Sequence, residues 1–294
     1  MSSLLSVASD FTQLALHALA HLAIDDPGRL DDPAYLAWSK RELPREAREP
    51  IERDAGVMAA LFGRDPRSAI VHAMPELFRD VAQLRASAAR DLAELGPADV
   101  AAPGLLAPLR EVEVLAELLR AAMALAADAF VATWKGGLEA RCQRGARMLT
   151  PHLEAMRALH PTLRDARVEL AWPLGARGRA FARRIVVGVP DDFASTDPRT
   201  PAVLALHEAV VRAQRCESRD ARERYVRIEW SALREVARCV GAAPPELRDA
   251  HAAWLASLDL APLCAAACAL GLTSESIAAR IATEPRERAY LLAG

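Results

Sequence analysis

The alternation of apolar and polar residues along the chain predicts helices over most of its length. In many segments apolar residues recur at intervals of three and four, which places them on one face of a helix. Prolines and glycines separate these segments. The predicted helices cover residues 3–24, 33–42, 45–63, 65–95, 109–133, 138–159, 201–215, 219–241, 246–258, 260–270 and 274–292.

One region follows a different pattern. In 167–174, Val168, Leu170 and Trp172 alternate with polar or small residues, and this period of two is typical of a half-buried strand. Residues 179–189 are rich in isoleucine and valine and follow the turn-like segment 175–178. The two segments together predict an antiparallel β-hairpin near residues 167–190. The fold class predicted is therefore mainly α, a multi-helix globular protein with one hairpin.

The chain of 294 residues is long enough for one large domain or two smaller ones. The change of pattern divides it into an N-terminal helical region, 1–163, and a region of hairpin and C-terminal helices, 164–294. The same elements could also form one continuous domain, and the sequence leaves both arrangements open.

Composition excludes several classes of protein. Hydrophobic residues make up 52% of the chain, but much of this share is alanine, which favours helix and adds little core volume. A net charge of -2 and 5% aromatic residues argue against a nucleic-acid surface. No apolar stretch has the length of a membrane span. Five cysteines without a CxxC pair, and a start without a secretory leader, predict a cytoplasmic protein with reduced thiols.

Common catalytic motifs are missing. The sequence has no P-loop, no GxGxxG after a strand and no GxSxG. The zinc-protease pattern HExxH begins at His207-Glu208 but has Val211 where the second histidine would stand. These absences exclude the enzymes that short motifs identify, and they leave open a site assembled from separate helices.

The first functional hypothesis rests on arginines in the predicted hairpin. Arginine pairs readily with carboxylate and phosphate groups, and an extended peptide could add a strand to the hairpin edge. The alternative is that these charges protect an exposed strand edge. We predict an accessory or interaction protein that binds a protein or peptide partner through this hairpin and adjacent helices, with these partner-binding residues: Arg167, Arg177, Arg179, Arg183 and Arg184.

The second hypothesis is a metal-dependent enzyme with a site of histidines and glutamates. His207 and Glu208 lie early in the helix after the hairpin, and Glu229 on the next helix could face them for acid–base chemistry. His17 and His21, four residues apart on one helix face, could hold a divalent transition metal together with His207. Both sets could equally be packed or solvated side chains of helices without a catalytic role.

Two further features have structural readings beside functional ones. Cys264 and Cys268 are also four residues apart and could bind a soft metal, or simply fill a tight helix contact. The C-terminal helices superficially suit a helix–turn–helix regulator, but 283–294 lacks the basic face of a recognition helix. Association with a second copy of the chain remains open.

Overall fold

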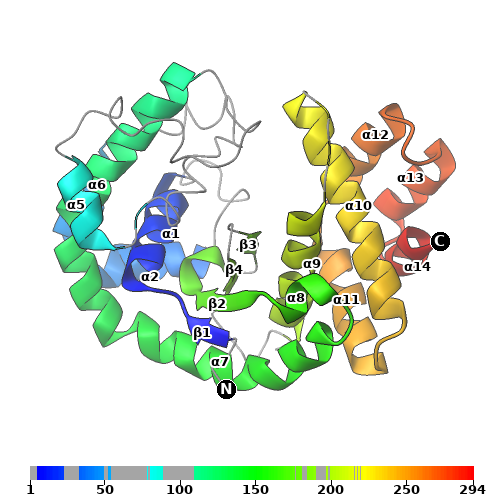
Figure 1. The fold of residues 1–294 in the computed structure, drawn as a ribbon, viewed down its shortest axis with the longest axis horizontal. Coiled ribbons are helices and arrows are strands. Elements are labelled where there is room, and N and C mark those ends of the chain that lie inside the picture. The colour runs from blue at the N-terminus through cyan, green and yellow to red at the C-terminus, as the bar shows by residue number, and fades with distance from the viewer. Residues whose placement is uncertain are drawn as a thin grey trace.

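The computed structural model describes residues 5–22, 33–49, 52–53, 78, 80–88, 109–175, 177–180, 184–189, 197, 199–214, 216, 218 and 220–294. Most of these residues are helical, and a small sheet lies between the N-terminal and C-terminal helices (Figure 1). The fold is therefore mainly α, as the apolar periodicity predicts. The first half contains α1 (Asp10–Leu22), α2 (Pro33–Glu42), α5 (Val81–Ala88), α6 (Leu109–Gly136), α7 (Leu138–Arg157) and α8 (Pro161–Arg164). Residues 45–49 and 52–53, within the predicted helix 45–63, are also helical.

The sheet has four strands in the order β1-β2-β4-β3. β1 pairs with β2, and β2 with β4, in parallel, whereas β3 runs antiparallel to β4. Short 3₁₀ helix η2 follows β2 and carries the chain away from the sheet. The bounds are Leu5–Val7 for β1, Arg167–Ala171 for β2, Trp172–Leu174 for η2, Gly178–Ala180 for β3 and Arg184–Gly188 for β4.

The predicted hairpin of 167–190 is corrected by this pairing. Its two main segments, β2 and β4, are neighbours but parallel, so the antiparallel hairpin is only β3 with β4. The chain reverses after β2 through η2 and Gly175, whose φ of 53° favours glycine. An alternation of period two shows which residues are buried, but it carries no information about the direction of the neighbouring strand.

The first predicted helix, 3–24, is also corrected at its start. Residues 5–7 form β1, and the helix begins at Asp10. The hydroxyl of Ser9 accepts a hydrogen bond from the backbone N–H of Thr12, as an N-terminal cap does. The apolar residues before this cap are therefore a buried strand rather than the first turn of a helix.

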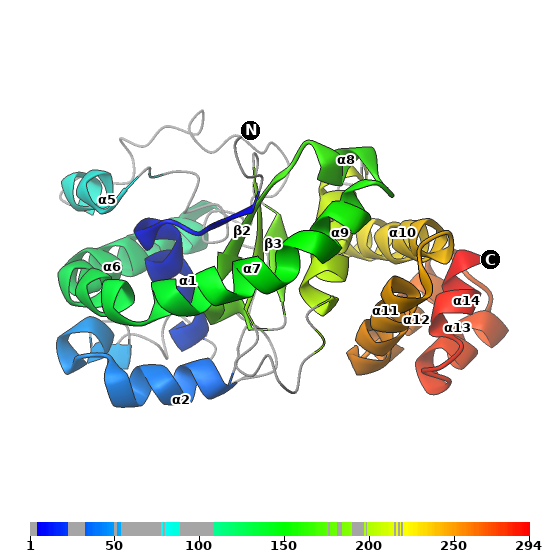
Figure 2. The same ribbon diagram turned by 90° about the horizontal axis from the view of Figure 1, so that it is seen from below.

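Two helices cover the sheet side by side. α7 packs along β1 and β2, α9 (Thr200–Ala213) packs along β3 and β4, and the two helices contact each other. Figure 2 shows α7 and α9 passing beside the strands. Because α9 packs on β3, polar side chains of α9 lie beside this antiparallel edge strand.

The remaining helices pack beyond α9. They are α10 (Ala221–Gly241), α11 (Pro245–Ser257), α12 (Ala261–Ala269), α13 (Glu275–Thr283) and α14 (Arg288–Ala293). The predicted helix 274–292 is two helices, since Pro285 interrupts it. Buried Arg288 binds the ends of α11 and α13 together, because its guanidinium donates to the carbonyls of Leu255 and Ile281.

Buried apolar residues from both halves of the chain form one connected cluster. The sheet likewise takes β1 from the N-terminal side of residue 163 and the other strands from the C-terminal side. The division at 163 stays a prediction. No single helix of the described segments is long and apolar enough to cross a membrane; α11 and α12 reach that length only together, across a bend of 85°.

Candidate functional site

The structure brings His207, Glu208 and Glu229 together. α9 supplies the first two and α10 the third, because these helices pack against each other. Nε2 of His207 lies 3.1 Å from Oε1 of Glu229, and Nδ1 lies 3.6 Å from Oε1 of Glu208. The His207 side chain is buried, with 6% exposed, and the two carboxylates are 14% and 22% exposed. We refer to these three residues as the His–Glu cluster.

The carboxylates determine the charge of the histidine. Burial by itself lowers the pKa of His207, but Glu229 and Glu208 outweigh it and raise this pKa to about 10. In return, burial raises the pKa of Glu229 while His207 and then Arg179 lower it, with a net decrease. His207 is thus an imidazolium at neutral pH. It can donate protons in hydrogen bonds, but it cannot accept one as a general base unless a ligand or metal displaces its own proton.

Arg179 and Tyr225 interact electrostatically with the carboxylates of the cluster. Burial lowers the pKa of Arg179 on β3, and the charges of Glu208 and Glu229 oppose this shift. Burial, and then the charge of Glu229, raise the pKa of Tyr225 to about 12. Half of the Tyr225 side chain is exposed, so the cluster reaches the protein surface on the Tyr225 side.

A glycine of β3 makes room for one of the carboxylates. A Cβ on Gly178 would lie 2.6 Å from Cγ of Glu208 and 3.2 Å from Cγ of Leu204. Any larger residue would therefore displace Glu208. The lack of a side chain at this position therefore allows β3 and α9 to approach each other closely.

Aromatic and imidazole rings form the inner wall of the cluster. The ring of Trp254 on α11 lies 5.1 Å from that of His207, and the ring of His251 lies 5.9 Å from Trp254. Burial and the positive charge of His207 lower the pKa of His251 to about 4. His251 is therefore neutral where His207 is charged, and the positive charge is confined to one imidazole.

The predicted metal ligands have separate environments. His17 Nδ1 lies 2.7 Å from the hydroxyl of Tyr35, and its ring packs 4.8 Å from Phe130. Neither Tyr35 nor Phe130 is among the residues described above around His207. His21 is helical, but its side chain lies outside the described residues. In the part of the chain that the structure describes, no three histidine, cysteine or acidic side chains are arranged to hold a metal ion.

The predicted partner-binding arginines form two groups. Arg167 and Arg184, at the start of β2 and β4, flank buried Glu169 at 3.1 and 3.4 Å. Arg177 precedes β3 and lies beside Gly188 at the end of β4, whereas Arg179 is the middle residue of β3 and pairs with Val186 in the middle of β4. Arg183 lies outside the described residues. Arg179 interacts electrostatically with Glu208 and Glu229, and Arg177 with Tyr225, whereas Arg167 and Arg184 pair with Glu169 instead.

β3 is an edge strand with outward backbone groups. The N–H of Gly188 donates to the carbonyl of Arg177 at 2.7 Å, so these residues form a hydrogen-bonded pair. Because such pairs alternate along an antiparallel ladder, the groups of Arg179 face β4, and those of Gly178 and Ala180 face away from it. Arg179 Nη1 donates to the outward carbonyl of Gly178 at 2.8 Å.

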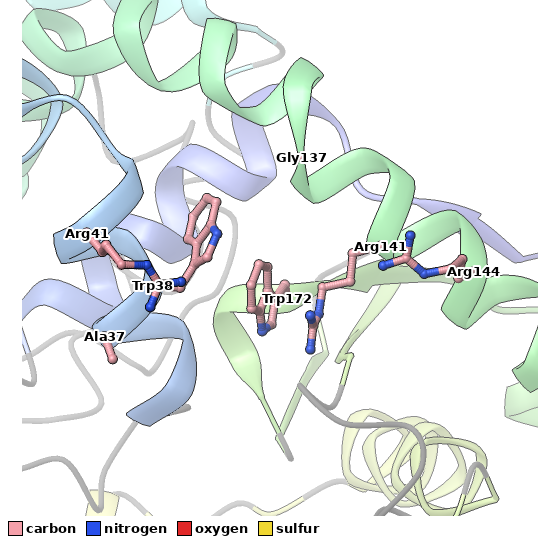
Figure 3. A pocket seen from close by; sticks show the side chains of 7 residues that line it. All are labelled: Ala37, Trp38, Arg41, Gly137, Arg141, Arg144 and Trp172. Carbon is pink, nitrogen blue, oxygen red and sulfur yellow. The ribbon is translucent and has the colours of Figure 1, made fainter.

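Sequence reasoning missed a second feature, a cavity of about 470 Å³ between α2, α7 and η2 (Figure 3). Tryptophans and arginines from separate elements line it. No local motif signals it, since residues far apart in the sequence contribute its walls. The lining residues are Ala37, Trp38, Arg41, Gly137, Arg141, Arg144 and Trp172.

Comparison of the chain with protein-family models, with curated proteins and with solved structures found no match in any of the three. The interpretation of the site therefore depends on its own geometry.

Proposed function

We propose that the protein binds an extended segment of a partner protein, which adds as a strand to β3. The observation that carries this proposal is the outward direction of the Gly178 and Ala180 backbone groups on the edge strand. Strand addition uses such groups for affinity, and neighbouring side chains for specificity. No other strand of the described segments pairs with this edge.

Arg179 supports the proposal because it covers the edge in the free protein. Its guanidinium occupies the carbonyl of Gly178, the acceptor that an added strand would use. A partner N–H would take over this carbonyl and release the guanidinium to pair with a partner carboxylate. The proposed partner segment is therefore extended and acidic, and its acidic side chain lies beside Arg179.

The decisive experiment changes one outward N–H. Ala180→Pro removes the N–H that faces a partner and leaves the β3–β4 ladder intact, since proline is tolerated where the N–H faces away from the sheet. Ala180→Val keeps this N–H and is the matched control. The probe is a displayed library of random peptides selected on the wild-type protein, followed by titration of the selected peptides.

We expect the selected peptides to be acidic, to bind the wild type and Ala180→Val equally, and to bind Ala180→Pro at least about tenfold more weakly, from loss of one backbone hydrogen bond. Hydrogen exchange should show new protection of the Gly178 and Ala180 amides in the complex. Equal binding to Ala180→Pro would refute the addition of a partner strand. So would light scattering and hydrogen exchange that show a second copy of the chain bound at β3. The same proposal places the protein in the cytoplasm, as an accessory protein.

A second candidate is an enzyme that uses the His–Glu cluster. The observation that favours it is the 3.1 Å contact between His207 and Glu229, which come from different helices. Histidine and glutamate are both zinc ligands, and a metal would take the place of the His207 proton. Such a metal needs at least one further ligand. The helix itself does not supply it, because Val211, which cannot bind a metal, stands four residues after His207 on the same helix face.

Metal analysis of untagged protein tests this candidate. A zinc-dependent enzyme would contain one equivalent of zinc, which His207→Gln would lose. Val211→His completes a pair of histidines four residues apart and is the positive control for detection. Zinc bound by the Val211→His variant and absent from the wild type would exclude the metalloenzyme.

A further inference from the structure

The cavity between α2, α7 and η2 has the composition of a ligand site. Its volume of about 470 Å³ is within the range of small-molecule sites, roughly 300–1,000 Å³. Two tryptophans and three arginines are among its seven lining residues, and none of the seven is acidic. We propose that this cavity binds a small planar aromatic anion, an aromatic or heteroaromatic ring that carries a phosphate or carboxylate group.

The aromatic side chains provide a stacking surface. The rings of Trp38 and Trp172 are 4.9 Å apart and inclined by 45°, and Tyr35 packs edge-on to Trp172 at 5.4 Å. This spacing leaves no room for a ring between the tryptophans, so a ligand ring would stack on the half-buried Trp38 from the cavity side. Trp172 and Tyr35 are almost fully buried and hold Trp38 in place.

The arginines supply the charge. The guanidinium carbon of Arg141 lies 3.8 Å from the ring centre of Trp172, a cation–π contact that fixes its plane. Arg144 is one turn further along α7 on the same side, and Figure 3 shows both side chains beside the cavity. Arg41 contributes from α2, although Glu42 pairs with it at 2.6 Å. Planar guanidinium groups bind phosphate and carboxylate in pairs of hydrogen bonds.

The start of α7 also borders the cavity. Gly137, the residue before the helix, lines the cavity and has no side chain that caps the helix end. The positive end of the α7 dipole favours anions within its first turn, but α6 ends at Gly136, directly before it, and its opposing negative end cancels much of this effect. Since no nucleophile or carboxylate lines the cavity, its chemistry suits binding rather than catalysis.

The test uses four probes and three variants of the full chain. Adenosine 5′-monophosphate and 2-naphthoate combine a ring with a phosphate or a carboxylate, whereas adenosine lacks the charge and inorganic phosphate lacks the ring. Tryptophan fluorescence and calorimetry follow binding. The variants are Arg144→Gln, Trp38→Leu and, as a matched control, Arg147→Gln, which removes an exposed charge of the same helix outside the lining.

We expect at least one ring-bearing anion to bind in the micromolar range, and adenosine and phosphate to bind at least tenfold more weakly. The choice between the nucleotide and naphthoate identifies the preferred anionic group. Arg144→Gln and Trp38→Leu should each weaken binding at least tenfold, and Arg147→Gln by less than twofold. Absence of binding by both ring-bearing anions at 1 mM, or equal binding to Arg144→Gln and Arg147→Gln, would overturn the proposal. Circular dichroism confirms folding, and Arg144→Gln remains decisive where Trp38→Leu does not fold.

Discussion

The charge of His207 makes a quantitative prediction about stability. The pKa of His207 is about 10 in the folded protein, against an ordinary value of about 6.5 in an unfolded chain. Between these two pH values the folded state holds one more proton than the unfolded state. The stabilisation is therefore complete below pH 6.5 and is lost as the pH rises through 10.

The magnitude follows from linkage. One extra proton in the folded state lowers the free energy of unfolding by roughly 1.4 kcal/mol for each pH unit of increase. Between pH 7 and pH 9 the contribution of His207 thus falls by about 2–3 kcal/mol. His207→Gln removes this titration and leaves Glu229 without its cation, so the variant is less stable at pH 7, and the difference narrows by this amount at pH 9.

Urea unfolding at pH 6, 7, 8 and 9 measures the effect. Thiols and tyrosines also titrate in this range, and the difference between wild type and His207→Gln cancels their contribution. His251→Gln is the matched control, because His251 is a neighbouring buried imidazole that is already neutral above pH 6. If the wild-type and His207→Gln free energies decrease in parallel between pH 7 and pH 9, His207 is not held as an imidazolium and the electrostatic account of the cluster fails.

Three further predictions concern stability. His251, with its pKa lowered to about 4, destabilises the folded state as the pH falls below 6.5, so the wild type should lose about 2 kcal/mol more than His251→Gln between pH 6 and pH 4 in urea unfolding. Gly188→Ala should lower the free energy of unfolding by about 3 kcal/mol or more, since its Cβ would lie 1.9 Å from the Gly175 carbonyl oxygen. Gly136→Ala is the control for thermal unfolding: nothing lies within 4 Å of its Cβ, so stability should change by less than about 1 kcal/mol. Arg288→Lys should lower the free energy of unfolding by about 3 kcal/mol, because an ammonium cannot reproduce the forked guanidinium that donates to carbonyls at 2.6–3.1 Å. Equal melting temperatures for this variant and the wild type would contradict that role.

The candidate site shows how far sequence reasoning reaches. The sequence suggests that Glu229 on the second helix after the sheet region could face His207 on the first, and the structure places them 3.1 Å apart. It could not show that the pair is charged, because this depends on burial by α10 and α11 and on Arg179 from β3. The cavity lined by Trp38 and Trp172 was missed, since neither residue has a neighbour in sequence that marks a site.

The sequence by itself determined most of the helices. The limits of α7, α9 and α10 differ from the predicted 138–159, 201–215 and 219–241 by at most two residues at either end. Helical hydrogen bonds join residues four apart, so glycine, proline and apolar spacing within one window contain the necessary information.

The tertiary structure alone decided how strands pair and which side chains meet. β2 and β4 have the residues of strands in the sequence, but only the path through η2 makes them parallel and leaves β3 at the edge. Strand hydrogen bonds and the contacts of the His–Glu cluster join segments that are distant in sequence. Their formation depends on packing over the whole chain, which no local pattern of residues records.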